Sequence, residues 1–532
     1  MKNTNSDTFK KLSFLKGMIP AENLTTALFI ALKVKKEANK PNDINDVLYE
    51  CSLHICNKYN CANVFETPNI FFNFYQAVNS MGLDWIDILN IDTGKFGPMQ
   101  IPSSVGNLLL DRVCDNISNV LIKDGEKFSL TLKDIVDKNK NCAYLITTTQ
   151  VLYFEVLKEI FAEYQNVEIM QVGMNDFEFT SQKFDLILSL PPFGVRMMVE
   201  QQRDFICREY ELASTESLLY HLSFTGKLVT ILPARITFAT GRVEELRNFI
   251  QKMYKIEEIS ELPTGIFSST AIKTYLFTIS SGMTDDVTIR RYKKVVDKKS
   301  KEVSIKLEDE TFVMNTELED FGDWNIDKIF ARQDDDWQNF QNSSTKRVTL
   351  ADVATSFRGK VVNAKDETGA IGVVNIANIK EFDIDYNSLD HLDTDERKIS
   401  NYILQDGDIL IPARGTTIKT AVFKVQQYPC IASSNLIVIR VNQNQILPVY
   451  LKIFLDSPLG IKQIKGLQQG TTLMNISYKD IMSVEIPMIP LEEQKVISEE
   501  YEKELSLYQN TISAANDRWQ NVVKELQNNF YE

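Results

Sequence analysis

The chain has 532 residues, with 44% hydrophobic and 24% charged residues and a net charge of −14. This length exceeds what one hydrophobic core organises and predicts two to four domains. The N-terminal MKNTNSDTFKK is not a signal peptide, and no run of 18 apolar residues occurs, so we expect a cytoplasmic protein without a membrane span. The acidity argues against an isolated DNA-binding protein, unless a local basic stripe or a partner supplies positive charge.

Residues 1–90 are predicted to form a helical N-terminal domain, because AENLTTALFIALKVKKEA and INDVLYECSLHICNKY space apolar residues by three and four. From 91 to 285, short apolar runs such as CAYLITT, FDLILSL and TYLFTIS alternate with helical stretches. That texture is typical of a parallel α/β sheet covered on both faces. The charged stretch 286–345 is predicted to be a small β excursion followed by a linker.

A group of cysteine and histidine residues in the helical region raises the question of zinc. Its members are Cys51, His54, Cys56 and Cys61. Their spacing is not the paired pattern of structural zinc sites, so we expect no metal and seven buried or free thiols in the chain.

The string FDLILSLPPFG is a buried strand that ends in two prolines and an aromatic residue. The four terminal positions are Leu190, Pro191, Pro192 and Phe193. The string resembles motif IV of the N-6 adenine DNA methyltransferases of type I modification subunits. The resemblance implies an Asn or Asp and a proline carbonyl that accept hydrogen bonds from the adenine amino group, beneath an aromatic side chain that stacks on the flipped base. Leu190 cannot accept such a bond and Ser189 would face the other way, so no catalytic residue is expected; Phe193 either stacks on a base or packs.

The cofactor motif of this family would lie upstream, in NVLIKDGEKFSL. Only Asp124 and Gly125 remain there as candidate cofactor-binding residues, and Thr147–Thr149 replaces the acidic residue that closes the next strand. Further upstream, Ile101 replaces the family's threonine, whereas TGKLVTILPARITF and ELPTGIFSSTAIKTYLFTI match its later strands. Three losses at chemical positions predict an inactive methyltransferase-like domain without a cofactor. The alternative is an active adenine methyltransferase that uses S-adenosylmethionine.

Residues 346–489 resemble the target-recognition domain of type I specificity subunits, through LQDGDILIPARGTTIKTAVF, LGIKQIKGLQQGTTLMNISYKDI and the proline-rich exit IPMIPLEEQ. Glycines allow backbone N–H groups to approach phosphates, and hydroxyl and basic side chains add donors. The candidate DNA-binding residues are Arg358, Lys360, Arg414, Gly415, Thr416, Thr417, Lys419, Gly470, Thr471 and Thr472. Lys462 and Lys465 would add positive charge on the preceding helix. The alternative for each basic residue is a solvated surface position.

Residues 490–532 are predicted to form one long helix that begins at Pro490. Its apolar residues alternate in steps of four and three, at Tyr501, Leu505, Tyr508, Ile512, Ala515, Trp519, Val522 and Leu526. This spacing is typical of a coiled-coil seam and favours pairing with another chain. The alternative is a helix that packs on its own domain.

The predicted fold is a multidomain α/β protein. It contains an N-terminal helical domain, a Rossmann-like methyltransferase sheet, an α+β target-recognition domain and a C-terminal coiled-coil helix. Type I specificity subunits carry two recognition domains, which implies that this single copy works as a homodimer or as a heterodimer with an active methyltransferase or restriction subunit. The expected function is sequence-specific binding of double-stranded DNA and scaffolding in a restriction–modification or related defence complex. A protein-interaction module without DNA affinity is the third alternative.

Overall fold

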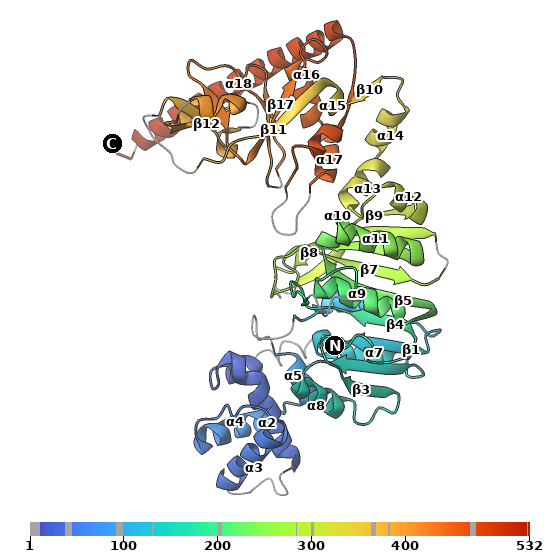
Figure 1. Ribbon diagram of the computed structural model, residues 1–532. Coiled ribbons are helices and arrows are strands. Elements are labelled where there is room, and N and C mark those ends of the chain that lie inside the picture. The colour runs from blue at the N-terminus through green and yellow to red at the C-terminus, as the bar shows by residue number, and fades with distance from the viewer. Residues whose placement is uncertain are drawn as a thin grey trace. The chain divides into compact units, whose positions relative to one another are not determined.

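Figure 1 shows the computed structural model of the chain. It describes all residues except 1–10, 38–44, 92–98, 130, 199–204, 283–284, 299–302, 363–368, 381–382, 395, 416, 469–474, 529 and 532. The chain forms two compact units, Met1–Trp324 and Asn325–Glu532. No helix within the described residues is long and apolar enough to cross a lipid bilayer.

Unit 1 begins with the helices expected over residues 1–90. They are η1 (Ala21–Asn23), α2 (Leu24–Glu37), α3 (Asn45–Lys58), α4 (Pro68–Met81) and α5 (Trp85–Leu89). Local sequence sets the ends of α4, because Thr67 caps its first turn and Gly82 ends it in the left-handed conformation, with φ of 61°. The apolar core beneath these helices continues under the sheet, so helices and sheet belong to one unit.

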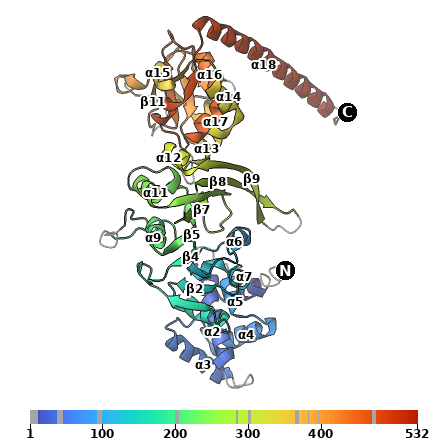
Figure 2. The same cartoon turned by 90° about the vertical axis from the view of Figure 1, so that its right-hand side faces the viewer.

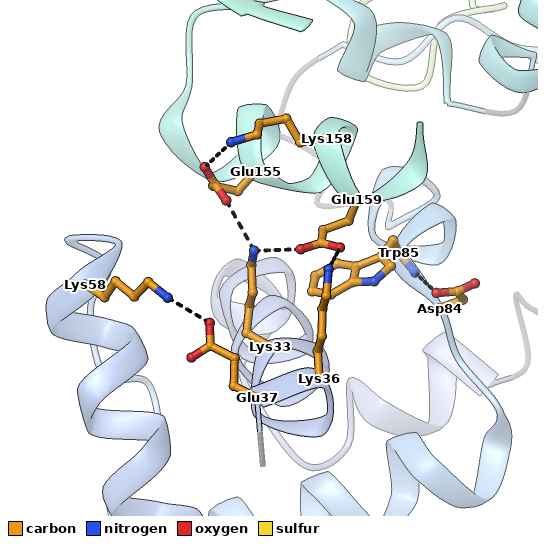
Figure 3. A network of polar contacts seen from close by, with 9 residues as sticks. All are labelled: Lys33, Lys36, Glu37, Lys58, Asp84, Trp85, Glu155, Lys158 and Glu159. Carbon is orange, nitrogen blue, oxygen red and sulfur yellow. Dashed lines mark hydrogen bonds and ion pairs between the residues drawn. The ribbon is translucent and has the colours of Figure 1, made fainter. Parts of the chain in front are cut away.

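A buried lysine joins α2 to helix α8 (Val151–Ile160) of the sheet region (Figure 3). The Lys33 ammonium lies 2.9 Å from a carboxylate oxygen of Glu159 and 3.2 Å from one of Glu155, and its side chain is only 4% exposed. It also lies 4.7 Å from the centre of the Tyr59 ring. The ion pairs therefore hold the helical region on α8, while the cation–π contact links α2 to Tyr59 within that region.

The centre of unit 1 is a nine-stranded sheet with the order β3-β2-β1-β4-β5-β7-β6-β8-β9. The strands are β1 (Asn119–Lys123), β2 (Ala143–Thr148), β3 (Val167–Gln171), β4 (Phe184–Ser189), β5 (Leu222–Pro233), β6 (Lys255–Leu262), β7 (Thr274–Ser280), β8 (Asp286–Val296) and β9 (Val303–Met314). Strands β1 to β5 are parallel, which places the carboxyl ends of β1, β2 and β4 at one edge. The remaining helices are α6 (Ser103–Leu110), η3 (Gly125–Phe128), α7 (Leu132–Lys138), α9 (Tyr210–Tyr220), α10 (Arg235–Phe238), α11 (Arg242–Met253) and α12 (Asn315–Asp320).

Two features of this sheet differ from the sequence-based expectation. The sheet is mixed, because β7 runs antiparallel to both β5 and β6. The loop from β6 to β7 contains no crossover helix, and a parallel return would require one. The stretch 286–345 is also more than an excursion and a linker, since β8 and β9 are the last two strands of the sheet. Its charges pair across the strands, as Arg290 does with Glu310 at 2.6 Å, and this pairing allows such a highly charged stretch to extend the sheet.

Unit 2 contains three small sheets, with strand orders β11-β17-β14-β15, β13-β12-β16 and β10-β18. The strands are β10 (Arg347–Thr349), β11 (Ala354–Arg358), β12 (Ile371–Val374), β13 (Asp390–Leu392), β14 (Ile409–Pro412), β15 (Ala421–Val422), β16 (Cys430–Ala432), β17 (Leu436–Val441) and β18 (Glu485–Pro487). The helices are α13 (Ile326–Gln333), α14 (Asp335–Asn342), α15 (Leu350–Val353), η4 (Ile376–Asn378), η5 (Tyr386–Ser388), η6 (Glu396–Lys398), η7 (Ser400–Tyr402), α16 (Pro448–Asp456), α17 (Pro458–Gly466), η8 (Asp480–Ser483) and α18 (Leu491–Asn528). Antiparallel pairing of β10 with β18 brings the two ends of the predicted recognition domain together.

Helix α18 is the long C-terminal helix that the sequence predicted, and it starts one residue after Pro490 (Figure 2). Gln494 anchors its first turns, because its side-chain amide donates to the carbonyls of Gln445 and Ile489 and accepts from the Leu447 N–H. Gln494 and Ser498 are buried, whereas the described residues beyond Leu505 are exposed to solvent in this unit.

Candidate functional sites

The first candidate site lies at the carboxyl ends of β1, β2 and β4 in unit 1. A cavity of about 690 Å³ opens there. The residues that line it are Glu22, Thr25, Thr26, Met99, Asp124, Glu126, Lys127, Thr149, Gln150, Leu152, Tyr153, Met174, Pro192, Phe193, Tyr210, Ser269, Thr270 and Ile272. The motif-IV residues Pro192 and Phe193 therefore face the same space as Asp124, which the sequence proposed for the cofactor.

The turn after β1 contains Lys127, for which the sequence predicted no role. The Lys127 ammonium donates to an Asp124 carboxylate oxygen and to the Leu190 carbonyl, both at 2.8 Å. Asp124 adopts the left-handed conformation, with φ of 59°, and the side chains of both charged residues are less than a tenth exposed. A buried internal amine thus donates to the backbone carbonyl of Leu190, the residue at the first motif-IV position.

Gly125, the other proposed cofactor residue, is not among the residues that line the cavity. A Cβ atom built on it would lie 2.3 Å from a methyl carbon of Ile146 on β2. Close packing of the turn on the sheet therefore accounts for this glycine.

Glu126 is a second charged residue of this turn that sequence reasoning missed. Its side chain is buried, and its Oε2 atom has no hydrogen-bond partner among the described residues. Burial, together with the nearby Asp124 carboxylate, raises the pKa of Glu126 to about 7. The turn thus places two carboxylates and one ammonium on the floor of the cavity.

The cavity does not fit S-adenosylmethionine in the way that the family resemblance implies. The end of β2 offers Thr149 and Gln150, where an acidic residue would hold the ribose. Gly125, the glycine left in the cofactor motif, packs against Ile146 and does not line the cavity. We therefore derive no methyl-transfer step from these residues.

The second candidate site is the loop after β14 in unit 2. Arg414 is exposed, and its backbone bridges to Asn475 across the loop. The Ile476 N–H donates to the Ala413 carbonyl at 2.9 Å, and the Gln468 side chain donates to the Gly415 carbonyl at 3.0 Å. These bonds join the flanks of the two Gly-Thr-Thr turns. Within those turns, Thr416, Gly470, Thr471 and Thr472 lie outside the described residues.

The C-terminal end of the same loop is also held by hydrogen bonds. Thr417 and Lys419 are exposed, whereas Thr420 is buried and donates through its hydroxyl to an Asp456 carboxylate oxygen at 2.7 Å. Lys452 pairs with the other oxygen of Asp456 at 2.6 Å. The loop therefore presents its polar side chains between two anchored ends.

Arg358 and Lys360, at the end of β11, lie near the same part of unit 2. The Arg358 guanidinium donates to the Ser434 carbonyl at 2.7 Å, and the Lys360 ammonium donates to the Lys398 carbonyl at 2.9 Å. The turn that includes Ser434 also bonds the Arg414 loop, because the Asn435 carbonyl accepts from the Ala413 N–H. The structure therefore brings Arg358 and the loop that carries Arg414 to the same turn, which contains Ser434 and Asn435.

Lys462 does not supply the free positive charge that the sequence suggested. Its ammonium lies 2.6 Å from a carboxylate oxygen of Asp334 and 3.4 Å from one of Asp336, on the α14 segment. The hydrogen bond from Lys462 holds the pKa of the Asp334 carboxyl below its usual range. The charge of this lysine is therefore compensated within the unit.

The predicted seam of α18 divides into two parts. Tyr501 and Leu505 are half-buried, and the Tyr501 ring lies 5.5 Å from the Lys452 ammonium of the recognition domain. Further along, the exposed apolar seam residues include Tyr508, Ile512, Trp519, Val522 and Leu526. Packing on the helix's own domain thus explains only the first two positions of the seam.

Cys51, His54 and Cys56 of the cysteine and histidine group lie on α3, and Cys61 follows that helix. The part of the chain that the structure describes contains no group of three or more His, Cys, Asp or Glu side chains placed to hold a metal ion. The seven cysteines are present as free thiols.

Comparison with known proteins gives matches to two families. Residues 342–508 match the type I restriction modification DNA specificity domain, and residues 156–397 match N-6 DNA methylase. The specificity subunit of the type I restriction enzyme EcoKI from Escherichia coli (strain K12) is 27% identical over 186 residues. This match covers 33% of the chain and 39% of that subunit.

Two solved structures also match the chain at low sequence identity. The methyltransferase subunit of a type I restriction-modification system from Streptococcus thermophilus is 14% identical, with a TM-score of 0.46, and the match covers 60% of this chain and 98% of that one. The type IIG restriction endonuclease BpuSI is 12% identical, with a TM-score of 0.43, and the match covers 90% of this chain and 72% of that one.

Proposed function

We propose that this chain, which has an N-6 DNA methylase region and a type I DNA specificity region, is a DNA-recognition and scaffolding subunit of the type I restriction–modification family. Unit 2 binds double-stranded DNA in a sequence-specific manner. Unit 1 keeps the methyltransferase-like sheet without transferring methyl groups. The protein acts within a restriction–modification or related defence complex.

The Arg414 loop is the observation that carries this proposal. Its two ends are anchored, and hydrogen bonds from Gln468 and Ile476 tie it to the flank of the second glycine turn. An exposed guanidinium on a fixed loop suits a phosphate or the edge of a guanine, because less side-chain and backbone freedom is lost on binding. Arg358 at the neighbouring turn extends the basic surface despite the net charge of −14.

The floor of the unit 1 cavity supports the absence of methyl transfer. The family resemblance implies a side-chain acceptor at position 190 for the target amino group, and Leu190 supplies none, while its backbone carbonyl accepts from Lys127. The alternative function, an active adenine methyltransferase, is favoured by the match of residues 156–397 to N-6 DNA methylase.

Calorimetric titration of the full chain with S-adenosylmethionine separates these two functions. We expect no saturable binding at concentrations up to hundreds of micromolar. Binding in the micromolar range would contradict the inactive assignment and favour the active enzyme.

We further propose that α18 pairs two recognition domains. A single chain carries one specificity region, and the exposed seam from Tyr508 to Leu526 supplies an apolar face for a second helix. The partner is a second copy of this chain or an active methyltransferase or restriction subunit with a matching helix.

A further inference from the structure

The floor of the cavity in unit 1 carries charges that methyl transfer does not use. We infer that this floor is a binding site for an organic amine, in which Lys127 fills one of two ammonium positions and Glu126 offers the other to a ligand. The inference goes beyond the proposed function, because it concerns a small-molecule ligand of unit 1 and does not depend on DNA binding by unit 2.

The first position shows how the floor recognises an ammonium group. Lys127 donates one hydrogen bond to the Asp124 carboxylate and one to the Leu190 carbonyl, both at 2.8 Å, in a place where its side chain is only 8% exposed. A carboxylate and a carbonyl at hydrogen-bonding distance are the acceptors that a buried ammonium needs.

At the second position, beside Glu126, no ammonium group of the described residues fills the corresponding place. The Oε2 atom of Glu126 and the Oδ1 atom of Asp124 are buried, and neither has a hydrogen-bond partner among the described residues. Glu126 is 1% exposed and lines the cavity. A buried carboxylate oxygen without a donor is costly, so a ligand that donates a hydrogen bond to it gains that free energy on binding.

The charge of the lining selects the class of ligand. Asp124 and Glu126 lie on the floor and Glu22 is exposed at the rim, whereas Lys127 is the one cation among the described lining residues. A positively charged amine would offset the excess of carboxylates. A phosphate or carboxylate group on the ligand would meet only Lys127, which is already paired with Asp124. The ligand is therefore an amine that carries no anionic group.

The walls favour an organic cation over a metal ion. The rings of Tyr153, Phe193 and Tyr210 and the thioethers of Met99 and Met174 line the cavity. Aromatic faces attract ammonium groups, and apolar walls pack on the carbon chain of an amine. Within the described residues, no group of three carboxylate, cysteine or histidine side chains is placed to hold a metal ion.

Because Glu126 titrates near neutral pH, ligand binding at this site should depend on pH. Burial and the Asp124 carboxylate raise its pKa to about 7, with the Lys127 ammonium acting in the opposite direction. Lys123 of β1 interacts electrostatically with this group, Thr148 of β2 and Tyr153 of α8 also face it, and Glu22 is at the rim. A bound ammonium favours the ionised carboxylate, so binding at pH 7 releases a proton and strengthens as the pH rises through 7.

Isothermal titration of the full chain with 1,4-diaminobutane tests the proposal, with 4-aminobutanoate and 1,4-butanediol as matched probes. We expect saturable binding of the diamine alone, with a heat that changes with the ionisation enthalpy of the buffer. Glu126→Gln should weaken binding at least tenfold, whereas Glu168→Gln, an exposed change on β3, should leave it unchanged.

Three results would overturn the proposal: no diamine binding at millimolar concentration, equal binding of the diol, or unchanged affinity in Glu126→Gln. Thermal unfolding of each variant shows whether it is folded. Titration with S-adenosylmethionine is a separate measurement. A failure of the amine site therefore leaves the proposed function intact, and binding of S-adenosylmethionine contradicts the proposed function without deciding the diamine result.

Discussion

Lys127 places its ammonium between Asp124 and the Leu190 carbonyl, on the floor of the cavity that Pro192 and Phe193 also line. Removing one partner of a buried ion pair leaves the other charge without compensation. We therefore predict that Lys127→Met lowers the stability of unit 1 by roughly 3–5 kcal/mol, measured by chemical denaturation.

The double variant Lys127→Met, Asp124→Asn provides the control for this prediction. It removes both charges and should recover much of the lost stability. A loss of less than about 1 kcal/mol in the single variant would show that the pair does not hold the cavity floor together.

Glu126 makes the stability of unit 1 depend on pH. Its pKa is about 7 in the folded protein and near the ordinary value of 4.5 in the unfolded chain, so the folded state binds the proton more tightly. This stabilising contribution is complete below about pH 4.5 and is lost as the pH rises through 7. Above pH 7, Glu126→Gln should be more stable than the wild type by roughly 2–3 kcal/mol, and its melting temperature should change less between pH 5 and 8. Parallel melting curves for the two proteins across that interval would contradict this assignment.

At the scale of elements, the contact between α2 and α8 depends on Lys33 (Figure 3). Its ammonium pairs with both Glu155 and Glu159, and its side chain is buried. Lys33→Met should destabilise unit 1 by roughly 3 kcal/mol, because two partly buried carboxylates lose their buried counter-ion and keep only the more exposed Lys36 and Lys158.

Lys58→Met is the matched control, since the Lys58–Glu37 pair in the same helical region is exposed. We expect its melting temperature to equal that of the wild type. If the two lysine variants melt at the same temperature, the buried network does not connect the helices to the sheet.

Much of this element-level organisation could be predicted from the sequence, where the pattern of side chains decided the structure locally. Proline at 490 and the acidic residues after it marked the start of α18 within one residue. The sequence indicated a small β excursion in 286–345 but not that β8 and β9 extend the large sheet, because their charges are satisfied by cross-strand partners such as Arg290 and Glu310 that only the fold brings together.

At the candidate sites, too, features set by local sequence could be predicted, whereas contacts between residues far apart in the chain could not. Leu190 could be identified from sequence as a departure from motif IV, because the surrounding string is local. Lys127 could not, since its role depends on a carbonyl 63 residues away in the chain. Likewise, nothing near Lys462 in the sequence indicates that Asp334 and Asp336 compensate its charge.

At the scale of the whole molecule, the exposed half of α18 predicts self-association. Ile512 is 41% exposed and Trp519 is 66% exposed, on the seam that continues to Leu526. We predict a dimer at micromolar concentration and a monomer for the double variant Ile512→Asp, Trp519→Asp, because charges at seam positions oppose burial. Sedimentation velocity measures both, with Asn510→Asp as an exposed polar control. A monomeric wild type would rule out self-pairing, and a dimeric double variant would place the interface elsewhere.

The central claim is that this acidic chain binds DNA through unit 2. Its most direct test is the affinity of the full chain for mixed-sequence duplex DNA, measured by fluorescence anisotropy over a series of salt concentrations. We expect the logarithm of the association constant to fall linearly with the logarithm of salt, as phosphate contacts release counterions. Arg414→Ala should weaken binding about five- to tenfold and make the slope shallower by about one, if its contact is to a phosphate. Lys462→Ala, whose charge is already paired, should match the wild type. Absence of binding at every salt concentration would contradict the account and leave a protein-interaction module as the function of this chain.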